Sequence, residues 1–488
     1  MKLESPVTRL PHAYVSCGQV YPGRIRLSFR ARNRGQKWKR KDDFQFQRQG
    51  ILLLFTVLMA ASMYLFYSYI SLSAPQGEHK LTSGPDANFS DLYPAWLGTR
   101  ELLFNNRDPY SAGVTASIQK GVWGRTVDSS KPGDPKDESR FAYPLYVVFL
   151  IAPTVLFSFS TAEVLFVAFA IAAGILSVWF WFRFFNPDRT AFQIGVAAVL
   201  FLGSWPFVLA LRVHQPALIV LALMTGAVAA LASALPWVGG VLLALSTIKP
   251  QAVIGITGWL LLWSVSNWKD RKGLFISFAL TLCAIFVGAE TLLPGWFGKW
   301  GEALSAYMRY APLPGALVQL IFGNLLGKVV GALVVLGIVV FCLRIRKDRA
   351  DSDRFKLAFA LIVSANLFIT PVWHPYDHIF LLPSVLLVWE WRAHFYRLKP
   401  VQRGILRFSA LALLWQWLAA AIGVGIAIAA PQLATSLRIL PYVPYFSILL
   451  LPPVVLTSLA LIGYARLSSP LQAPSDHMTG TNGGCDSS

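Results

Sequence analysis

The sequence has little cysteine and little charge for its length. Four cysteines occur in 488 residues, and Cys17, Cys283, Cys342 and Cys485 are scattered without a Cys-x-x-Cys pair or a metal-ligand spacing. This distribution argues against a disulfide framework. Charged residues make up only 14% of the chain and hydrophobic residues 55%. Several apolar runs approach or exceed about 18 residues, the length that crosses a hydrocarbon core, so the chain is predicted to be a polytopic membrane protein.

Several common nucleotide-binding and hydrolase motifs are also missing. No Gly-x-Gly-x-x-Gly, Walker, Gly-x-Ser-x-Gly or His-Glu-x-x-His element occurs in a plausible context. No segment between the apolar runs is large enough to form a soluble domain that binds a nucleotide-sugar. These absences direct attention to the polar residues that lie at the ends of the predicted membrane helices.

The basic residues are concentrated at the N-terminus. Residues 1–49 contain twelve of the 43 lysines and arginines but only three acidic residues. Nucleic-acid binding is one interpretation of such a segment. A disordered cytoplasmic tail, retained inside by its charge and attracted to anionic lipid, is favoured, and no nucleic-acid partner is expected. Residues 50–466 are then the transmembrane domain, and residues 467–488, which are rich in Ser and Gly, form a second disordered tail.

Loop charge predicts the membrane topology. The first apolar run, 51–72, is preceded by far more residues than a signal peptide carries, so it is expected to be a retained span. The run 141–159 is bent by Pro144 and Pro153 and is either a short span or a helix in the outer interface. The interfacial interpretation gives about twelve membrane helices, a long first outer loop and both termini in the cytoplasm, with most bases inside.

This topology places several polar groups at the outer ends of the helices. Asp91 follows the first span and is a candidate catalytic base, the alternative being a solvated loop carboxylate. Lys249 precedes Pro250, where the helix is expected to break; the alternative is a lysine that reaches to the interface. His214 and Gln215 form another such turn, in which the histidine is either a functional group or a helix cap.

A histidine pair lies in a further outer turn, His374-Pro375-Tyr376-Asp377-His378. The spacing His-x-x-x-His is compatible with a metal site. Pro375 and the lack of a third nearby ligand argue against one, and no metal or other cofactor is expected. An ordinary polar turn is the remaining alternative to a substrate-binding role.

Taken in order, these motifs resemble the family 87 glycosyltransferases of the GT-C superfamily, the DUF2029 type that includes polyprenol-phosphate-mannose-dependent mannosyltransferases. The matching elements are Phe89-Ser90-Asp91-Leu92-Tyr93-Pro94-Ala95, Asn106-Arg107-Asp108-Pro109-Tyr110, Phe141-Ala142-Tyr143-Pro144, His214-Gln215-Pro216, Gly240 to Pro250 and His374 to His378. Two of them depart from the pattern. The family turn usually has Gly-Gln-x-Asn where this chain has His214-Gln215-Pro216-Ala217, and Tyr-Pro-Pro where it has Tyr143-Pro144-Leu145.

The resemblance implies an all-α GT-C-like fold and an inverting hexose transfer. The expected donor is a polyprenyl-phosphate sugar, with mannose as the sugar, and the expected acceptor is a lipid or envelope glycan on the outer face of the cell membrane. Asp91 fits the base that takes the acceptor proton. The expected substrate-binding residues are Lys249, His374, His378, Asp377, His214, Gln215, Tyr93 and Tyr143. Membrane lipids are the other expected partners, and the run 141–159 is a candidate lining for a groove that holds the polyprenyl chain.

Two other classes of function remain open. A lipid or solute transporter, or flippase, would use Asp91, Lys249 and the histidines as a relay. Against this alternative, the polar groups are predicted at one membrane face rather than at the midplane, and no inverted repeat is evident. A non-catalytic partner in an envelope-polymer assembly is the third hypothesis.

Overall fold

The structure, a computed structural model, describes residues 32–68, 90–131, 134–135, 137–310, 315–371, 374–437, 440 and 443–468. The chain divides into two units, Met1–Leu54 and Phe55–Ser488, and every functional group discussed below belongs to the second. Most of the predicted C-terminal tail and residues 1–31 of the predicted N-terminal tail lie outside the described residues. Helix α1 runs from Arg32 to Phe66. The helix therefore begins inside the segment predicted to be disordered, well before the apolar run.

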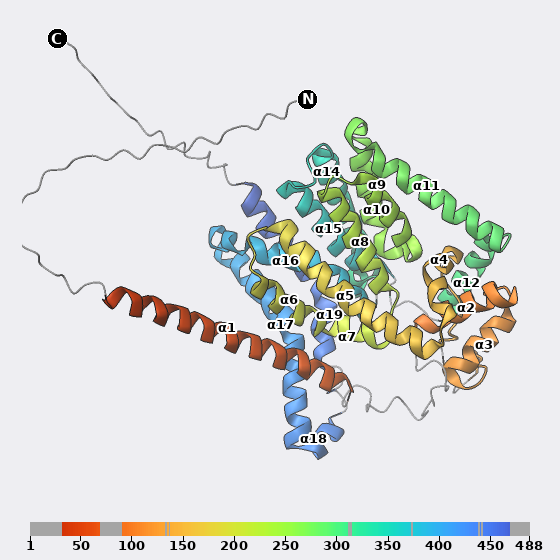
Figure 1. The fold of residues 1–488 in the computed structure, drawn as a ribbon, viewed down its shortest axis with the longest axis horizontal. Helices are drawn as coiled ribbons and strands as arrows, with labels where there is room; N and C mark the ends of the chain where they lie inside the picture. Colours follow the sequence, from red (N-terminus) through yellow and green to blue (C-terminus); the bar gives the residue numbers. More distant parts are fainter. Residues whose placement is uncertain are drawn as a thin grey trace, which may run out of the picture. The chain divides into compact units, whose positions relative to one another are not determined.

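The described residues form helices joined by turns and loops, and they contain no strand (Figure 1). A membrane leaves a spanning backbone no water to bond with, and a helix satisfies its own backbone groups. Within the part of the chain that the structure describes, six helical segments are long and apolar enough to cross a bilayer: Gln47–Phe66, Phe159–Phe185 (α5), Trp268–Leu292 (α11), Asn324–Ile345 (α14), Pro400–Ala429 (α17) and Ser447–Leu467, which lies within α19 (Val443–Leu467). These helices make the chain a multi-pass membrane protein.

A bent pair of helices adds a possible seventh span. Helices α6 (Ala191–Leu202) and α7 (Trp205–Arg212) meet at 58°. Further apolar helices are shorter: α8 (Ala217–Ala232), α9 (Pro236–Leu245) continued by η4 (Ser246–Ile248), and α10 (Pro250–Val265). The count of twelve spans stays a prediction.

Prolines determine where several of these helices stop. Lys249 has a non-helical backbone (φ −127°, ψ 75°), because the proline that follows disfavours the helical conformation, and Pro250 begins α10. Helix α15 (Asp353–Ile369) is followed by the short helix η5 (Pro375–Leu381), which also opens with a proline. Such breaks expose backbone groups and polar side chains, which is tolerable at membrane depth only where protein covers them.

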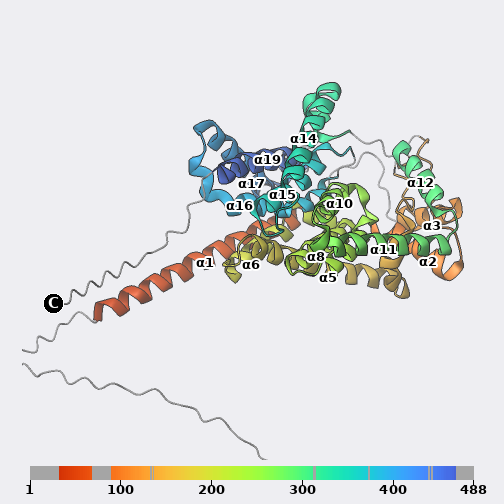
Figure 2. The same cartoon turned by 90° about the horizontal axis from the view of Figure 1, so that it is seen from above.

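Close helix packing supports these breaks. Helix α9 lies against α11, as Figure 1 shows, and α17 lies against α19 (Figure 2). A Cβ at Gly240 would meet the Ser277 hydroxyl at 2.0 Å, so only glycine allows α9 and α11 to approach this closely. The short span that ends at Lys249 is thereby fixed in position.

The segment after the first helix builds a small helical layer. It contains α2 (Leu92–Asn105), α3 (Ala112–Trp123), η2 (Leu145–Val147), α4 (Val148–Ile151) and η3 (Ala152–Leu156). At about 1.5 Å per residue, the apolar stretch 145–156 is too short to cross a bilayer. The Trp96 indole of α2 donates a hydrogen bond to the Thr154 carbonyl at 3.2 Å, which ties α2 to this stretch.

The remaining helices complete the fold. They are α12 (Trp296–Tyr310), α13 (Leu317–Phe322), α16 (Leu382–Glu390), η6 (Trp391–Arg397) and α18 (Pro431–Ser436). Helix α7 contacts η5, and η5 also contacts α8 and α15. The chain breaks at residues 213–216, 249 and 374 are therefore brought together from distant parts of the sequence.

Candidate active site

Asp91 stands at the start of α2 and is held by the turn that follows α7. Its backbone N–H donates to the Val213 carbonyl at 2.7 Å. Gln215 Nε2 donates to Asp91 Oδ2 at 2.7 Å, and the Tyr143 hydroxyl donates to the Asp91 carbonyl at 3.2 Å. The carboxylate does not cap its own helix. Three contacts from two distant segments thus fix the position of Asp91, and within the described residues only Gln215 bonds to its carboxylate, through Oδ2.

The surroundings of Asp91 raise its pKa to about 7. Burial is the largest cause, and the negative charges of Asp137 and Asp377 add to it, whereas Lys249 acts in the opposite direction. A carboxylate with this pKa gains a proton readily and is still largely ionised slightly above neutral pH. That is the property expected of a general base that works near neutral pH.

Lys249 forms a buried ion pair with Asp377 of η5. Lys249 is 8% exposed and Asp377 is 4% exposed. The ammonium also lies over the Tyr376 ring, 4.9 Å from its centroid. The predicted helix break at Lys249 is therefore present, and the side chain points into the protein rather than along its surface. A buried cation of this kind fits an anionic ligand, although Asp377 already neutralises part of its charge.

The two histidines of η5 are present as neutral rings at neutral pH. The His374 ring stacks on Tyr376 with centroids 4.9 Å apart, and burial lowers its pKa. His378 is 3% exposed, and burial lowers its pKa to about 4. Neutral imidazoles can donate or accept hydrogen bonds, but they do not add positive charge. The cationic character of this part of the site therefore resides in Lys249.

Two of the predicted substrate-binding residues face elsewhere. The Tyr93 ring packs against Trp96 and Phe159, with centroids 6.0 Å and 4.8 Å away, and belongs to the apolar core. The His214 ring packs on Phe166 at 6.0 Å, on the side of α5. Asp91, Gln215, Tyr143, Lys249, Asp377 and His374 are linked by hydrogen bonds, ring contacts or electrostatic interactions, whereas Tyr93 and His214 border this group without joining it.

Sequence reasoning did not single out two groups at this site, Asp137 and Tyr307. Asp137 raises the pKa of Asp91, and the charges of Asp137, Asp91 and Asp377 contribute, after burial, to raising the pKa of Tyr307 to about 12. Tyr307 lies on the amphipathic helix α12, and Asp137 lies in a polar loop that resembles ordinary surface. No local pattern marks either residue, because only the fold brings them near Asp91.

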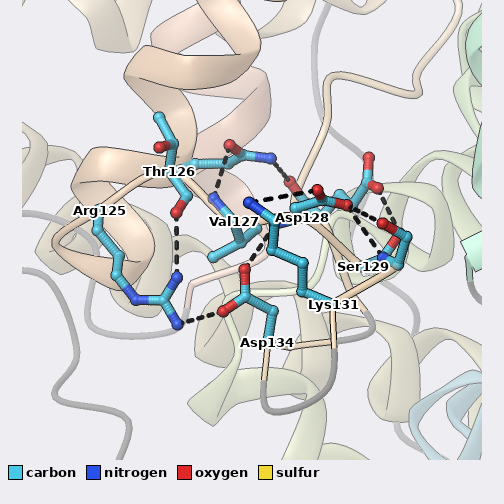
Figure 3. A network of polar contacts seen from close by, with 10 residues as sticks. Arg125, Thr126, Val127, Asp128, Ser129, Lys131 and Asp134 are labelled. Carbon is cyan, nitrogen blue, oxygen red and sulfur yellow. Dashed lines mark hydrogen bonds and ion pairs between the residues drawn. The ribbon is translucent and has the colours of Figure 1, made fainter.

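The loop that carries Asp137 is shaped by a network of polar contacts, which Figure 3 shows. The Arg125 guanidinium pairs with Asp134 at 2.6 Å, and Asp134 also accepts the Asp128 backbone N–H at 2.8 Å. Ser129 donates to Glu138 at 2.5 Å, next to Asp137. The loop is therefore held by several contacts within itself, and these contacts set where Asp137 is placed.

Asp108 plays the capping role that its position before Pro109 predicts. Its Oδ1 accepts the Tyr110 backbone N–H at 2.8 Å, and its Oδ2 pairs with Lys299 at 2.8 Å. The Tyr110 hydroxyl donates to the Tyr143 carbonyl at 2.7 Å. Asp108 thus supports the segment that contacts Asp91 and does not itself reach the Asp91 carboxylate group.

Among the described residues, no three His, Cys, Asp or Glu side chains are grouped so that they share a metal ion. The expectation that the site works without a metal stays a prediction. The groups present are a carboxylate with a raised pKa, a buried cation and several neutral donors. Such a set is suited to proton transfer at one point and to binding an anion at another.

The fold and the site define a multi-pass membrane protein with a buried polar centre where broken helices meet. Residues 141–371 match the sequence model of Glycosyltransferase family 87. This match confirms the resemblance carried by the ordered motifs, and it supports a glycosyltransferase activity. No protein of established function matches the chain. The family match starts beyond Asp91, so the role of this carboxylate depends on the structure.

Proposed function

We propose that the protein is an inverting glycosyltransferase that moves a hexose, mannose, from a polyprenyl phosphate to a lipid or envelope glycan acceptor at the outer membrane face. One observation supports this proposal best. Asp91, whose pKa is raised to about 7, lies close enough to the buried cation Lys249 for the two charges to interact. A base and a leaving-group site are the two requirements of such a reaction.

The reaction follows from these two groups. The acceptor hydroxyl oxygen attacks the anomeric carbon and forms the new glycosidic bond, while its proton passes to the Asp91 carboxylate. The bond between the anomeric carbon and the phosphate oxygen breaks, and its electron pair leaves with the polyprenyl phosphate. Lys249 stabilises the negative charge that develops on this phosphate, with His374 or His378 as neutral hydrogen-bond partners. Attack opposite the leaving group inverts the anomeric configuration.

An apolar cavity next to the site supports a lipid-linked donor. It has a volume of about 310 Å³ and lies between α10, α14 and α15. Helix α10 starts directly after Lys249, and Ile254, Val339 and Ile369 line the cavity. An isoprenoid chain in this cavity would leave its phosphate near the start of α10. We therefore place the polyprenyl chain here, as an alternative to the run 141–159.

The proposed orientation puts both termini in the cytoplasm and the site outside. It rests on the distribution of basic residues, with twelve spans and the stretch 145–156 in the outer interface. Labelling of a single cysteine at position 129 with an impermeant reagent tests it, because Ser129 lies in the proposed outer loop (Figure 3). We expect labelling in intact cells. Labelling only after permeabilisation would overturn the orientation.

Sugar transfer by the purified protein tests the function itself. The protein in lipid nanodiscs is supplied with polyprenyl-phosphate mannose and a membrane-lipid extract, and the product is analysed by mass spectrometry and NMR. We expect a mannosylated lipid with inverted anomeric configuration. Movement of the donor across proteoliposomes without any transfer would instead support the transporter hypothesis.

A further inference from the structure

Helix α12 begins directly after a helix that is long enough to cross the membrane (Figure 1). Helix α11 ends at Leu292 and α12 starts at Trp296. The turn between them is tight: Gly295 has a left-handed backbone with φ +74°, and its N–H donates to Glu290 Oε1 at 2.8 Å. A connection of this length extends over at most about 14 Å. The first turn of α12 therefore lies close to the membrane surface.

The side chains of α12 give the helix three distinct sides. One side is buried or half-buried in the protein, and its members recur at intervals of three or four residues: Trp296, Trp300, Ala303 and Tyr307. The next side is apolar and exposed, and it consists of Phe297, Leu304 and Met308. The third side is polar and exposed, and it consists of Glu302, Ser305 and Arg309. A helix with this pattern is suited to the boundary between lipid and water.

The apolar side of α12 continues the surface that α11 presents to lipid. The Phe297 ring lies 5.8 Å from the Phe286 ring of α11, centroid to centroid. Phe286 and Leu292 are exposed on a helix that is long and apolar enough to cross the membrane. Lipid that surrounds the end of α11 therefore also reaches Phe297. We propose that α12 lies in the outer membrane interface, with Leu304 and Met308 in the lipid, and that this contact positions the active site. The inference rests on the proposed function and deepens it.

The protein side of α12 holds the segment 142–146. The Trp300 indole donates a hydrogen bond to the Ala142 carbonyl at 3.1 Å. The Trp296 ring meets the Tyr146 ring edge-on, with centroids 5.8 Å apart. Two tryptophans one helical turn apart thus attach α12 to both ends of this segment. A displacement of α12 would displace the segment with it.

The same segment contacts both the base and the cation site. The Tyr143 hydroxyl donates to the Asp91 carbonyl at 3.2 Å. The Tyr146 hydroxyl donates to the Thr247 carbonyl at 3.0 Å, two residues before Lys249. Transfer rates depend steeply on such geometry, and a misplacement of about 1 Å can lower a rate by about a hundredfold. Lipid contact along α12 therefore sets the distance between the two reacting groups of the site.

Fluorescence quenching tests the membrane contact without requiring turnover. The full-length protein, with its four cysteines replaced by alanine, receives one new cysteine, Met308→Cys or Ser305→Cys, and each is labelled with a fluorophore. The labelled protein is placed in nanodiscs whose lipids carry a nitroxide near the top of the acyl chain. We expect the nitroxide lipid to quench the label at 308 several-fold more than the label at 305, and aqueous iodide to show the reverse order.

Two results of the quenching experiment would overturn the interfacial position of α12. One is equal quenching of both labels by the nitroxide lipid. The other is protection of the label at 308 from the lipid nitroxide and from iodide together, because a second protein surface, such as another copy of this chain, would then cover the apolar side.

A double variant, Leu304→Gln with Met308→Gln, tests whether the lipid contact positions the site. We expect kcat for transfer to fall by roughly ten- to a hundredfold, since the site geometry loosens. Donor affinity and the melting temperature should stay near those of the wild type, because both side chains are exposed rather than packed in the core. Glu302→Gln with Arg309→Gln is the matched control on the polar side and should keep kcat. Leu304→Met with Met308→Leu preserves the apolar side and should keep it as well.

The outcomes separate this proposal from the proposed function. A wild-type kcat in Leu304→Gln with Met308→Gln would overturn the positioning role, and so would an equal loss in the polar-side control. Failure of the transferase proposal appears differently, as a lack of mannose transfer by the wild-type protein itself. The quenching of the two labels does not depend on that result.

Discussion

The buried centre around Asp91 and the loop network around Asp134 use the same residue types with opposite results. In the loop, the contacts with Arg125 lower the pKa of Asp134, and the side chain of its partner Arg125 is half exposed. At the centre, burial and nearby carboxylates raise the pKa of Asp91 to about 7. A cation and water next to a carboxylate stabilise its charged form and lower its pKa. Burial and neighbouring negative charges raise the pKa, so that the carboxylate can accept a proton near neutral pH.

The two regions also differ in how far their partners lie apart in the sequence. The loop pairs join residues that are neighbours, such as Arg125 with Asp134. The central pairs join Asp91 with Gln215 and Lys249 with Asp377, across more than a hundred residues. Contacts between residues close in the sequence shape a loop, whereas contacts between distant residues depend on how the helices pack. The comparison predicts that substitutions at the centre affect chemistry strongly and that substitutions in the loop affect it little.

The largest expected effect is that of Asp91→Asn. Asparagine keeps the shape and can still accept a hydrogen bond from Gln215, but it cannot take a proton. We expect transfer to fall by roughly two to four orders of magnitude, while the fold and donor binding are retained. Single-turnover transfer assays and donor titrations measure both. Asp108→Asn is the matched control and should lower stability more than turnover. An inactive Asp108→Asn beside a fully active Asp91→Asn would show that the wrong carboxylate was chosen.

Lys249→Ala should have the next largest effect. Loss of the contact to the leaving phosphate is expected to cost roughly 2–4 kcal/mol of transition-state stabilisation. The variant also leaves Asp377 buried without its partner, which is expected to lower stability by about 3–5 kcal/mol. Turnover and thermal unfolding measure the two effects.

A double variant, Lys249→Met with Asp377→Leu, separates these effects. An apolar pair of similar volume should restore stability without restoring transfer. Lys249→Arg should recover little activity, because a guanidinium does not replace a compact ammonium in a tight site. Normal turnover in Lys249→Ala, or in the double variant, would refute the assignment to the leaving group.

A smaller effect concerns stability against pH. The folded pKa of Asp91 is raised to about 7 from an ordinary value of 3.8, so the folded state binds a proton more readily than the unfolded state. The contribution of Asp91 to the free energy of unfolding is therefore fully present below pH 3.8, and it is lost as the pH rises towards 7. Asparagine does not ionise, so Asp91→Asn lacks this pH-dependent loss. We expect the variant and the wild type to have similar free energies of unfolding at pH 4, and the variant to be more stable at pH 8, on the order of a few kcal/mol. Thermal unfolding in detergent across this range checks the difference, and a less stable variant at pH 8 would contradict the raised pKa.

The smallest effect is expected for Arg125→Gln in the loop network. Exposed ion pairs contribute little, because water already solvates both charges. Transfer should stay within about twofold of wild type. Turnover measured beside Asp91→Asn completes the comparison. A large loss of transfer in Arg125→Gln would mean that the Arg125–Asp134 ion pair, although exposed, is needed to position Asp137.

Much of the fold could be predicted from the sequence. Long apolar runs require helices in a membrane, and the helix break predicted before Pro250 is present in the structure. Asp108 caps a turn, as its position before Pro109 predicts, because this contact depends only on near neighbours in the sequence. The sequence did not predict that α1 begins at Arg32, because the polar stretch before the apolar run carries no membrane signal.

The sequence by itself determined the helical class, the positions of the breaks and the polar residues that occupy them, because these depend on neighbours along the chain. Only the tertiary structure decided which of those residues meet. In the tertiary structure Tyr93 lies in the core, His214 packs against Phe166 of α5, and Asp137 lies near enough to Asp91 to raise its pKa. It also decided charge: burial keeps His378 neutral and raises the pKa of Asp91. Desolvation depends on what packs around a group, and that packing comes from segments more than a hundred residues away.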